Sequence, residues 1–237
     1  MTITNTVHIL GFTRNPEAMK RTCAEVERVG FRADPYWNVP SPYIDFLVRK
    51  MPCHWMIEKN HGFLSCTLGH YSIWKTFREL GEPSIFVCED DCRFLKDKEM
   101  VHEALANHPQ DADILLLDTL FPEKGGEPVK VNYLAERAKA SKGWARVSRA
   151  RSMCCYIINK SMADRLIYLN ESGIRREKQL ICDQWLDTKY MGNLKIYSAV
   201  PNLAIQQRPP EDVKRNSGIQ NWKYGVQGTE ESQYGEW

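Results

Sequence analysis

The first part of the chain combines two hydrophobic periods, one typical of strands and one typical of helices. A short β-rich run covers residues 4–10, and an amphipathic segment, residues 16–29, follows it after Gly11. The apolar positions of that segment recur at intervals of four, three and three residues, at Met19, Cys23, Val26 and Val29. This spacing predicts a helix with one buried face, and residues 31–37 predict a second strand. The chain therefore opens with a β-α-β unit, the start of a parallel sheet.

Strands and helices continue to alternate along the rest of the chain. Short apolar runs predict strands at 84–88, 113–117, 144–147, 153–158 and 196–200. Helical spacing of apolar residues predicts helices at 64–80, 98–107, 161–170 and 183–190. Residues 38–62 are interpreted as a loop with one short helix, and residues 121–135 as an irregular insertion. The pattern predicts an α/β fold with a mixed, mainly parallel sheet flanked by helices, in one domain over residues 1–217 with a polar tail over 218–237.

The composition excludes several classes of protein. Apolar residues make up 43% of the chain and charged residues 26%, which is ordinary for a globular protein and too apolar for a disordered one. The formal net charge is only +2, so the overall charge gives no case for nucleic-acid binding. No run approaches the roughly 18 apolar residues of a membrane helix, and the N-terminus has no signal-peptide pattern. We therefore expect a cytoplasmic protein.

The cysteine content fits the same compartment. Eight cysteines without a secretion signal favour free thiols in a reducing environment. Their spacing contains no C-x-x-C pair, and the adjacent Cys154 and Cys155 would point to opposite faces of an extended strand. We interpret the cysteines as buried or incidental thiols rather than as metal ligands.

An acidic triplet, Glu89-Asp90-Asp91, directly follows the predicted strand 84–88. Three neighbouring acids repel one another unless a cation offsets the repulsion, and their hard oxygen atoms suit Mg²⁺ or Mn²⁺. A solvated acidic turn is the alternative interpretation. Asp118 follows another predicted strand, and ligands of open α/β sheets bind where the parallel strands end. The two strand ends are therefore the first places to look for a binding site.

The triplet belongs to a longer series of motifs in a fixed order. It is preceded by Ser65-Cys66-Thr67-Leu68-Gly69-His70 and a helix with Trp74, and followed by Phe94. Later motifs are Cys155-Tyr156-Ile157-Ile158-Asn159-Lys160 with Ala163, Cys182-Asp183-Gln184-Trp185-Leu186, and Pro201 with Gln206 and Ser217. In this order the motifs resemble glycosyltransferase family 25, which includes lipooligosaccharide and collagen galactosyltransferases. Ser65 and Gly69 stand where the family pattern has Gly and Ser, which implies a divergent member.

The resemblance implies a GT-A-like (Rossmann-like) fold and an inverting transfer from a UDP-sugar, with galactose as the family-level guess. The acceptor would be a surface glycan or a lipooligosaccharide. A divalent cation, Mn²⁺ or Mg²⁺, stabilises the leaving diphosphate in such chemistry. Asp91 is the stronger candidate for a metal ligand, and Glu89 would bind the metal directly or through water. Asp90 would contact the donor sugar or its ribose.

Four further residues are candidates for the site. Asp183 would be the general base for the acceptor hydroxyl. It could instead complete the metal shell or simply begin a helix. His70, Arg14 and Asp118 are candidate donor contacts. Their structural alternatives are a packed or capping histidine, a surface charge at a helix start, and a loop acid.

A local basic stretch surrounds Trp144, with positive charges at Lys139, Lys142, Arg146, Arg149 and Arg151. A solvated face explains it, and the functional alternative is attraction to an anionic acceptor or to the inner face of the membrane.

Two other functions stay open at the level of the sequence. One is a metal-dependent phosphoryl-transfer or hydrolase enzyme that uses the same acidic cluster. The other is a non-catalytic carbohydrate-binding domain on a degenerate transferase fold. A phosphoryl-transfer or hydrolase enzyme would ordinarily need further metal ligands close by. A non-catalytic domain would have no need of the acids that this chain retains, which are Glu89, Asp90, Asp91 and Asp183.

Overall fold

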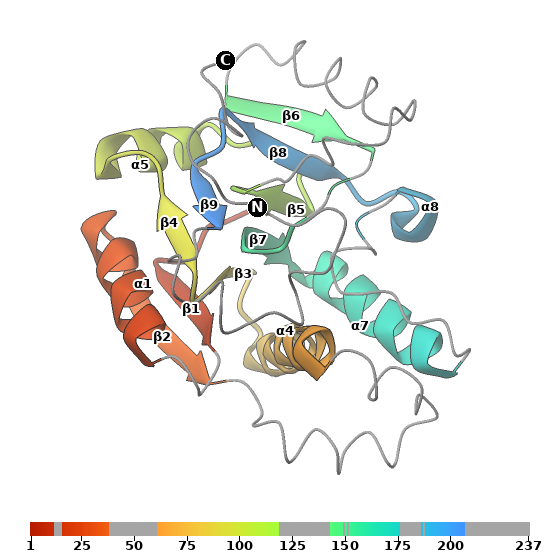
Figure 1. The fold of residues 1–237 in the computed structure, drawn as a ribbon. Coiled ribbons are helices and arrows are strands. Elements are labelled where there is room, and N and C mark those ends of the chain that lie inside the picture. Colours follow the sequence, from red (N-terminus) through yellow and green to blue (C-terminus); the bar gives the residue numbers. More distant parts are fainter. Residues whose placement is uncertain are drawn as a thin grey trace, which may run out of the picture.

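A computed structural model describes residues 1–11, 16–37, 61–118, 143–148, 150, 152–175, 186 and 188–206. Within these ranges it describes all side chains except those of 61–65, 173–175 and 188–189. The architecture is a seven-stranded sheet with helices on both faces, accompanied by a separate two-stranded sheet (Figure 1).

The seven strands of the main sheet lie in the order β2-β1-β3-β7-β5-β8-β6. Their bounds are β1 Thr6–Gly11, β2 Arg32–Trp37, β3 Ser84–Glu89, β5 Ile114–Leu116, β6 Gly143–Val147, β7 Cys155–Asn159 and β8 Ile196–Val200. The helices are α1 Pro16–Arg28, α4 His61–Leu80, α5 Lys98–Ala106, α7 Lys160–Arg175 and the short α8 Thr188–Met191. The two-stranded sheet pairs β4 Cys92–Phe94 with β9 Ala204–Gln206.

Five of the seven strands run in one direction, and β7 and β6 run against them. β1 is parallel to β2 and β3, and β5 is parallel to β8, whereas β7 is antiparallel to both β3 and β5. The carboxyl ends of β1, β3 and β5 therefore meet the amino end of β7 at one edge of the sheet. We call this the acidic edge and define it by Gly11, Glu89, Asp91 and Asp118.

The sheet is buried on both faces because side chains along each strand point alternately to opposite sides. In β3, Ile85 and Val87 face the cluster formed with α4 and α7, while Phe86 and Cys88 face the cluster formed with α1 and α5. All six residues of β3 are buried. Because helices cover both faces of the sheet, β3 is apolar at consecutive positions and does not alternate between apolar and polar residues.

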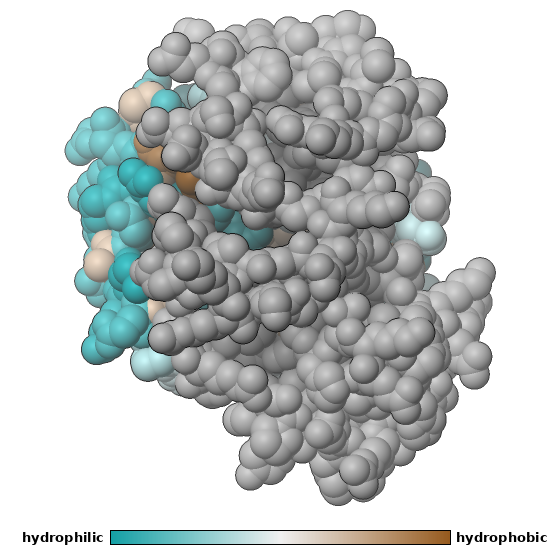
Figure 2. Space-filling view, in the orientation of Figure 1, coloured by the Kyte–Doolittle hydropathy of each residue, from teal (hydrophilic) through white to brown (hydrophobic). Residues whose placement is uncertain are grey.

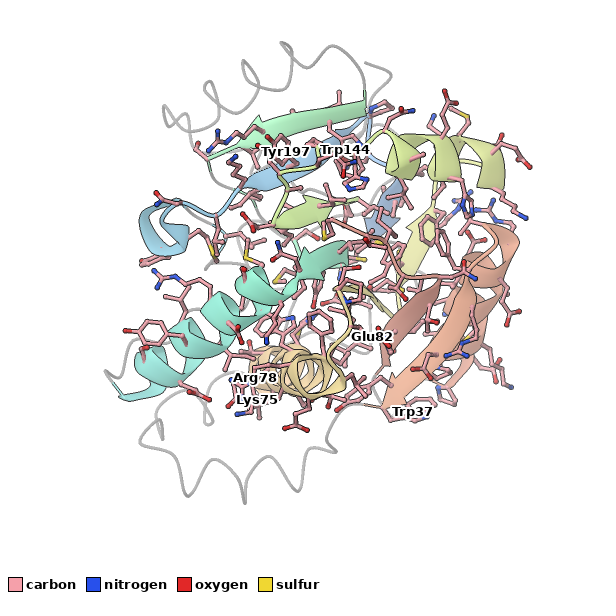
Figure 3. The ribbon with its side chains drawn as sticks, turned by 180° about the vertical axis from the view of Figure 1, so that it is seen from behind. Trp37, Lys75, Arg78, Glu82, Trp144 and Tyr197 are labelled. Carbon is pink, nitrogen blue, oxygen red and sulfur yellow. The ribbon has the colours of Figure 1, made fainter. Side chains whose placement is uncertain are left out.

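Helices α4 and α7 pack together on one face of the sheet. The Tyr71 hydroxyl donates a hydrogen bond to Glu171 Oε1 over 2.8 Å, and Lys75 Nζ lies 3.6 Å from the same oxygen. Figure 3 shows Lys75 and Arg78 on the outer side of α4, away from the sheet. Polar pairs at the rim thus accompany the apolar contact between the helices.

The described surface over α1 and α5 is mainly hydrophilic (Figure 2), as expected of helices whose other face is buried. None of the helices in the described ranges has the length and apolar character needed to cross a membrane.

The predicted order of elements agrees with the structure in the described ranges, with local corrections. Strands β4 and β9 were not predicted, because three residues are too few to show a period. Helix α7 begins at Lys160, one residue before the predicted start, and is capped by Asn159, whose Oδ1 accepts from the Met162 amide over 2.9 Å. Helix α8 begins at Thr188, and Leu186 lies outside it, so the helix predicted from residue 183 starts later than expected.

Candidate active site

Backbone hydrogen bonds fix the acidic triplet where β3 ends. The Glu89 amide donates to Cys154 O over 2.8 Å, and the Asp90 amide donates to Leu10 O over 2.9 Å. The Thr22 hydroxyl of α1 donates to Asp90 O over 2.7 Å. Contacts from β1, from α1 and from the residue before β7 therefore hold the backbone of the turn.

The side chain of Asp90 points toward the end of β1. Its Oδ2 lies 3.4 Å from the place that a Cβ would occupy at Gly11, and the residue is 7% exposed. Asp90 thus belongs to a different part of the acidic edge from its two neighbours, beside Gly11 at the end of β1.

The carboxylates of Glu89 and Asp91 converge on one atom. Gln206 Nε2 donates to Glu89 Oε2 over 3.2 Å and to Asp91 Oδ2 over 3.0 Å. Strand β9 brings the amide there because Gln206 pairs with Cys92, the residue directly after Asp91. A single position at the acidic edge therefore lies within reach of both carboxylates.

The other oxygen of Glu89 faces helix α4. His70 Nε2 lies 3.1 Å from Glu89 Oε1, and the Cys66 thiol donates to the same oxygen over 3.3 Å. His70 is fully buried, and its Nδ1 lies 2.8 Å from the Tyr156 hydroxyl, which also accepts from Trp74 Nε1 over 2.9 Å. A chain of buried polar groups on the α4 side thus orients the Glu89 carboxylate.

The neighbours of His70 favour the protonated, positively charged form of its ring. Burial disfavours that charge, but the neighbouring sulfur of Cys66 and the Glu89 carboxylate outweigh burial and raise the pKa of His70 to about 10. The imidazolium offsets part of the negative charge at the acidic edge. Since both ring nitrogens are engaged, His70 acts on the site through Glu89.

Asp118 is a third carboxyl group at the edge, directly after β5 and Leu117. It is fully buried, and the Ser152 hydroxyl donates to its Oδ2 over 2.9 Å. Burial raises the pKa of Asp118 to about 7; the Ser152 hydrogen bond opposes this rise, and the charges of Asp91 and Glu89 add to it. Its Oδ1 has no hydrogen-bond partner among the residues that the structure describes.

Ser152 reaches Asp118 from an uncommon backbone conformation. Its φ is 82°, in the left-handed region that favours glycine, and its hydroxyl also accepts from the Cys154 amide over 3.2 Å. A glycine would relieve the backbone but would lose both contacts. The hydroxyl therefore gives a structural reason for serine at this position.

A buried thiol, that of Cys154, lies next to the acidic edge. Cys154 Sγ lies 3.9 Å from Asp91 Oδ1. Burial raises the pKa of the Cys154 thiol well above its usual range, with added effects from Asp91, Asp118 and Glu89, so the thiol stays protonated. The six cysteines within the described ranges are free: Cys23, Cys66, Cys88, Cys92, Cys154 and Cys155.

The residues at the acidic edge fit a divalent cation. Carboxylate oxygens of Glu89 and Asp91 and the sulfur of Cys154 lie within 4.8 Å of one another. The position now filled by the amide hydrogens of Gln206 is one where a cation would contact both carboxylates. Two hard oxygen donors suit Mg²⁺ or Mn²⁺, which complete their shells with water and phosphate oxygens.

The structure brings together five of the seven predicted site residues: Glu89, Asp90, Asp91, His70 and Asp118. Arg14 and Asp183 lie outside the described residues, and so do all members of the basic stretch except Arg146, which is exposed on β6. The predicted contact of that stretch with an anionic membrane stays a prediction.

Several residues of the site were not predicted as such: Cys66, Tyr156, Ser152, Cys154 and Gln206. Cys66, Tyr156 and Gln206 belong to the motifs described above, and the four-residue interval between Cys66 and His70 on one helix was a visible signal. The contacts of the remaining residues depend on strand order, which no local pattern reveals.

Comparison with known sequences gives one family. Residues 58–184, more than half of the chain, match the sequence model of glycosyltransferase family 25, described as LPS biosynthesis protein. A comparison with curated proteins gives no match.

Solved structures give low-scoring matches. The apo glycosyltransferase GlyE of Streptococcus pneumoniae is 11% identical, with 83% of this chain and 45% of that chain covered and a TM-score of 0.44. A glycosyltransferase involved in glycosylation of the major capsid of PBCV-1 is 9% identical, with coverages of 90% and 97% and a TM-score of 0.43. The galactosyltransferase LgtC with donor and acceptor sugar analogs is 9% identical, with coverages of 86% and 87% and a TM-score of 0.39. This chain spans about half the length of the GlyE chains.

Proposed function

Because this chain belongs to glycosyltransferase family 25, we propose that it transfers a sugar from a UDP-sugar to a glycan or glycolipid acceptor, with inversion and with the help of Mn²⁺ or Mg²⁺. The mixed α/β sheet agrees with the GT-A-like fold expected of such an enzyme. The observation that carries the proposal is the convergence of Glu89 and Asp91 on one position at the acidic edge. Galactose as the transferred sugar, and a lipooligosaccharide as the acceptor, are the family-level choices.

The cation would supply Lewis-acid stabilisation of the leaving diphosphate. Glu89 and Asp91 would hold it, and Gln206 would keep the two carboxylates convergent before it binds. His70 would orient Glu89 through Nε2, while its own orientation is fixed by Tyr156. The two carboxylates already converge, and the Gln206 amide would move away from the position between them when the cation binds.

Asp90 and Asp118 are the proposed donor contacts among the described residues. Asp90 lies beside the end of β1, where it would meet the ribose or the donor sugar. Asp118 Oδ1 is buried and has no hydrogen-bond partner among the described residues, so it offers an atom to which a sugar hydroxyl could donate. Arg14, on the segment that leaves β1, is proposed as a nucleotide contact.

Asp183 is proposed as the general base, and Asp183→Asn is expected to reduce turnover by roughly 10²–10⁴-fold. Donor and metal affinity should stay near wild type, because a base acts on the acceptor proton and not on the diphosphate. Transfer kinetics and titration of UDP binding with Mn²⁺ separate these effects. Parallel loss of cation-dependent donor affinity would assign Asp183 to the metal shell, and unchanged kinetics would leave it a structural role.

A panel of nucleotide sugars with and without Mn²⁺ tests the proposed function. One UDP-sugar is expected to raise the melting temperature in the presence of the cation, because a ligand that binds only the folded state stabilises it. Asp91→Asn should lose this shift, and the exposed-acid control Glu99→Gln on α5 should keep it.

The two alternatives give different results in the same panel. Release of the free sugar or of phosphate without an acceptor would favour the hydrolase. Stabilisation by a glycan, with no response to any nucleotide, would favour the non-catalytic carbohydrate-binding domain. Either result would contradict the proposed transfer.

A further inference from the structure

A second cluster of ligand atoms lies behind the proposed catalytic cation, on the α4 side of Glu89. It consists of Cys66 Sγ, His70 Nε2 and Glu89 Oε1, which all lie within 4.8 Å of one another. These are a thiol, an imidazole nitrogen and a carboxylate oxygen, the three ligand types that zinc prefers. On its other side, toward Asp91, Glu89 belongs to the pair of carboxylates described above, which offer hard oxygen donors.

The helix explains why two of these ligands meet. Cys66 and His70 are four residues apart on α4, so their side chains lie on one face, one turn apart. Two ligands at this interval on a helix are a common way to present a metal with two side chains. Strand β3 then brings Glu89 to the same face of the helix.

The separations of the ligand atoms match those of a tetrahedral zinc site. Bond lengths of about 2.3 Å for Zn–S and about 2.0 Å for Zn–N and Zn–O give ligand separations of about 3.5 Å for S–O and about 3.3 Å for N–O. The observed separations are 3.3 Å from Cys66 Sγ to Glu89 Oε1 and 3.1 Å from His70 Nε2 to the same oxygen. These two separations lie within a few tenths of an ångström of the tetrahedral values, and the third, between Cys66 Sγ and His70 Nε2, is at most 4.8 Å.

The surroundings of the cluster also suit a metal. The Tyr156 hydroxyl lies 2.8 Å from His70 Nδ1, so that His70, once its Nε2 binds a metal, donates its other ring N–H to an oxygen. Such an outer partner fixes the orientation of a metal-bound histidine. Cys66 is half-buried, which leaves a path from solvent to the cluster.

We propose that Cys66, His70 and Glu89 bind Zn²⁺, or another thiol-binding divalent cation, with water as the fourth ligand. On binding, the Cys66 thiol proton and the His70 Nε2 proton pass to solvent, and bonds to Sγ, Nε2 and Oε1 replace them. Glu89 Oε2 stays directed at Asp91 and Gln206, so the zinc site lies beside the proposed catalytic cation without taking its place.

The binding is tested on the full chain with Zn²⁺ and Co²⁺ alone. Competition with a chromophoric chelator measures Zn²⁺ affinity and stoichiometry, and thiolate-to-metal absorption of the Co²⁺ form reports a sulfur ligand. We expect one equivalent with a thiolate band. Cys66→Ser should remove the band and weaken binding at least about 100-fold. These readouts need no donor or acceptor, so they are independent of the transferase proposal.

Two cysteine variants serve as controls. Cys23→Ser removes a half-buried thiol from α1, and Cys154→Ser removes the sulfur that lies near Asp91 on the other side of the site. Both should keep the band and the affinity of the wild type. The proposal is overturned if the wild type gives no thiolate band, if Cys66→Ser binds like the wild type, or if Cys154→Ser also loses the site.

Discussion

Asp91→Asn is expected to reduce sugar transfer by about 10³-fold, since it removes one of two carboxylates that converge on the proposed cation position. The change replaces one oxygen by an amide nitrogen at nearly constant volume. Asp91 is only partly buried and lies in a turn held by backbone hydrogen bonds, so the fold should persist. The loss should therefore be one of chemistry and of cation-dependent donor binding.

Transfer kinetics and Mn²⁺ titration of UDP binding measure this loss. Circular dichroism of the same sample shows whether the fold persists. Glu99→Gln, an exposed acid on α5, is the control for loss of one negative charge. Wild-type affinity for UDP with Mn²⁺ in Asp91→Asn would remove the metal role from this residue. Loss of ellipticity would instead show that Asp91 supports the fold.

Asp118→Asn is expected to change how the stability of the protein depends on pH. The pKa of Asp118 rises from 3.8 to about 7 in the folded state, so between these values the folded protein keeps a proton that the unfolded chain has released. The stabilisation that the Asp118 proton gives the folded state is fully present below pH 3.8 and is lost as the pH rises through 7. Each pKa unit corresponds to about 1.4 kcal/mol, so the free energy of unfolding loses about 4 kcal/mol over this range.

Asparagine mimics the neutral acid, so the variant should gain stability relative to the wild type as the pH rises. Between pH 5 and pH 8 the gain is expected to be about 3 kcal/mol. Urea unfolding of both proteins at the two pH values, with EDTA to remove cations, measures the difference. An equal change with pH in both proteins would show that Asp118 ionises without a penalty.

The main sheet was predictable because its strands are buried runs separated by amphipathic helices. The run 84–88 and the acids after it could be placed at one edge of the sheet without knowing any contact. Asp118 followed from the same rule. A strand-end rule works because parallel strands bring their carboxyl ends together, whichever strands are neighbours.

The residues that support the acidic groups, such as Gln206 and Ser152, could not be predicted in this way. Gln206 contacts Asp91 only because β9 pairs with β4, and neither three-residue strand has a period. Ser152 reaches Asp118 because β7 runs against its neighbours and begins at the edge where they end. Such contacts depend on strand order, which is set by the packing of the whole domain.

The acidic edge is also the place where several segments outside the described residues join the sheet. Trp37 and Gly143, which flank the segments 38–60 and 119–142, pair with Gly11 and Val200 at that edge, and Gln206 leads from it into residues 207–237. Changes in the length of these segments would therefore attach at the acidic edge, where we propose that the donor binds. Exchange of such segments between relatives, with the acidic turn and its supporting groups kept, would therefore test whether they determine the acceptor of the proposed transfer.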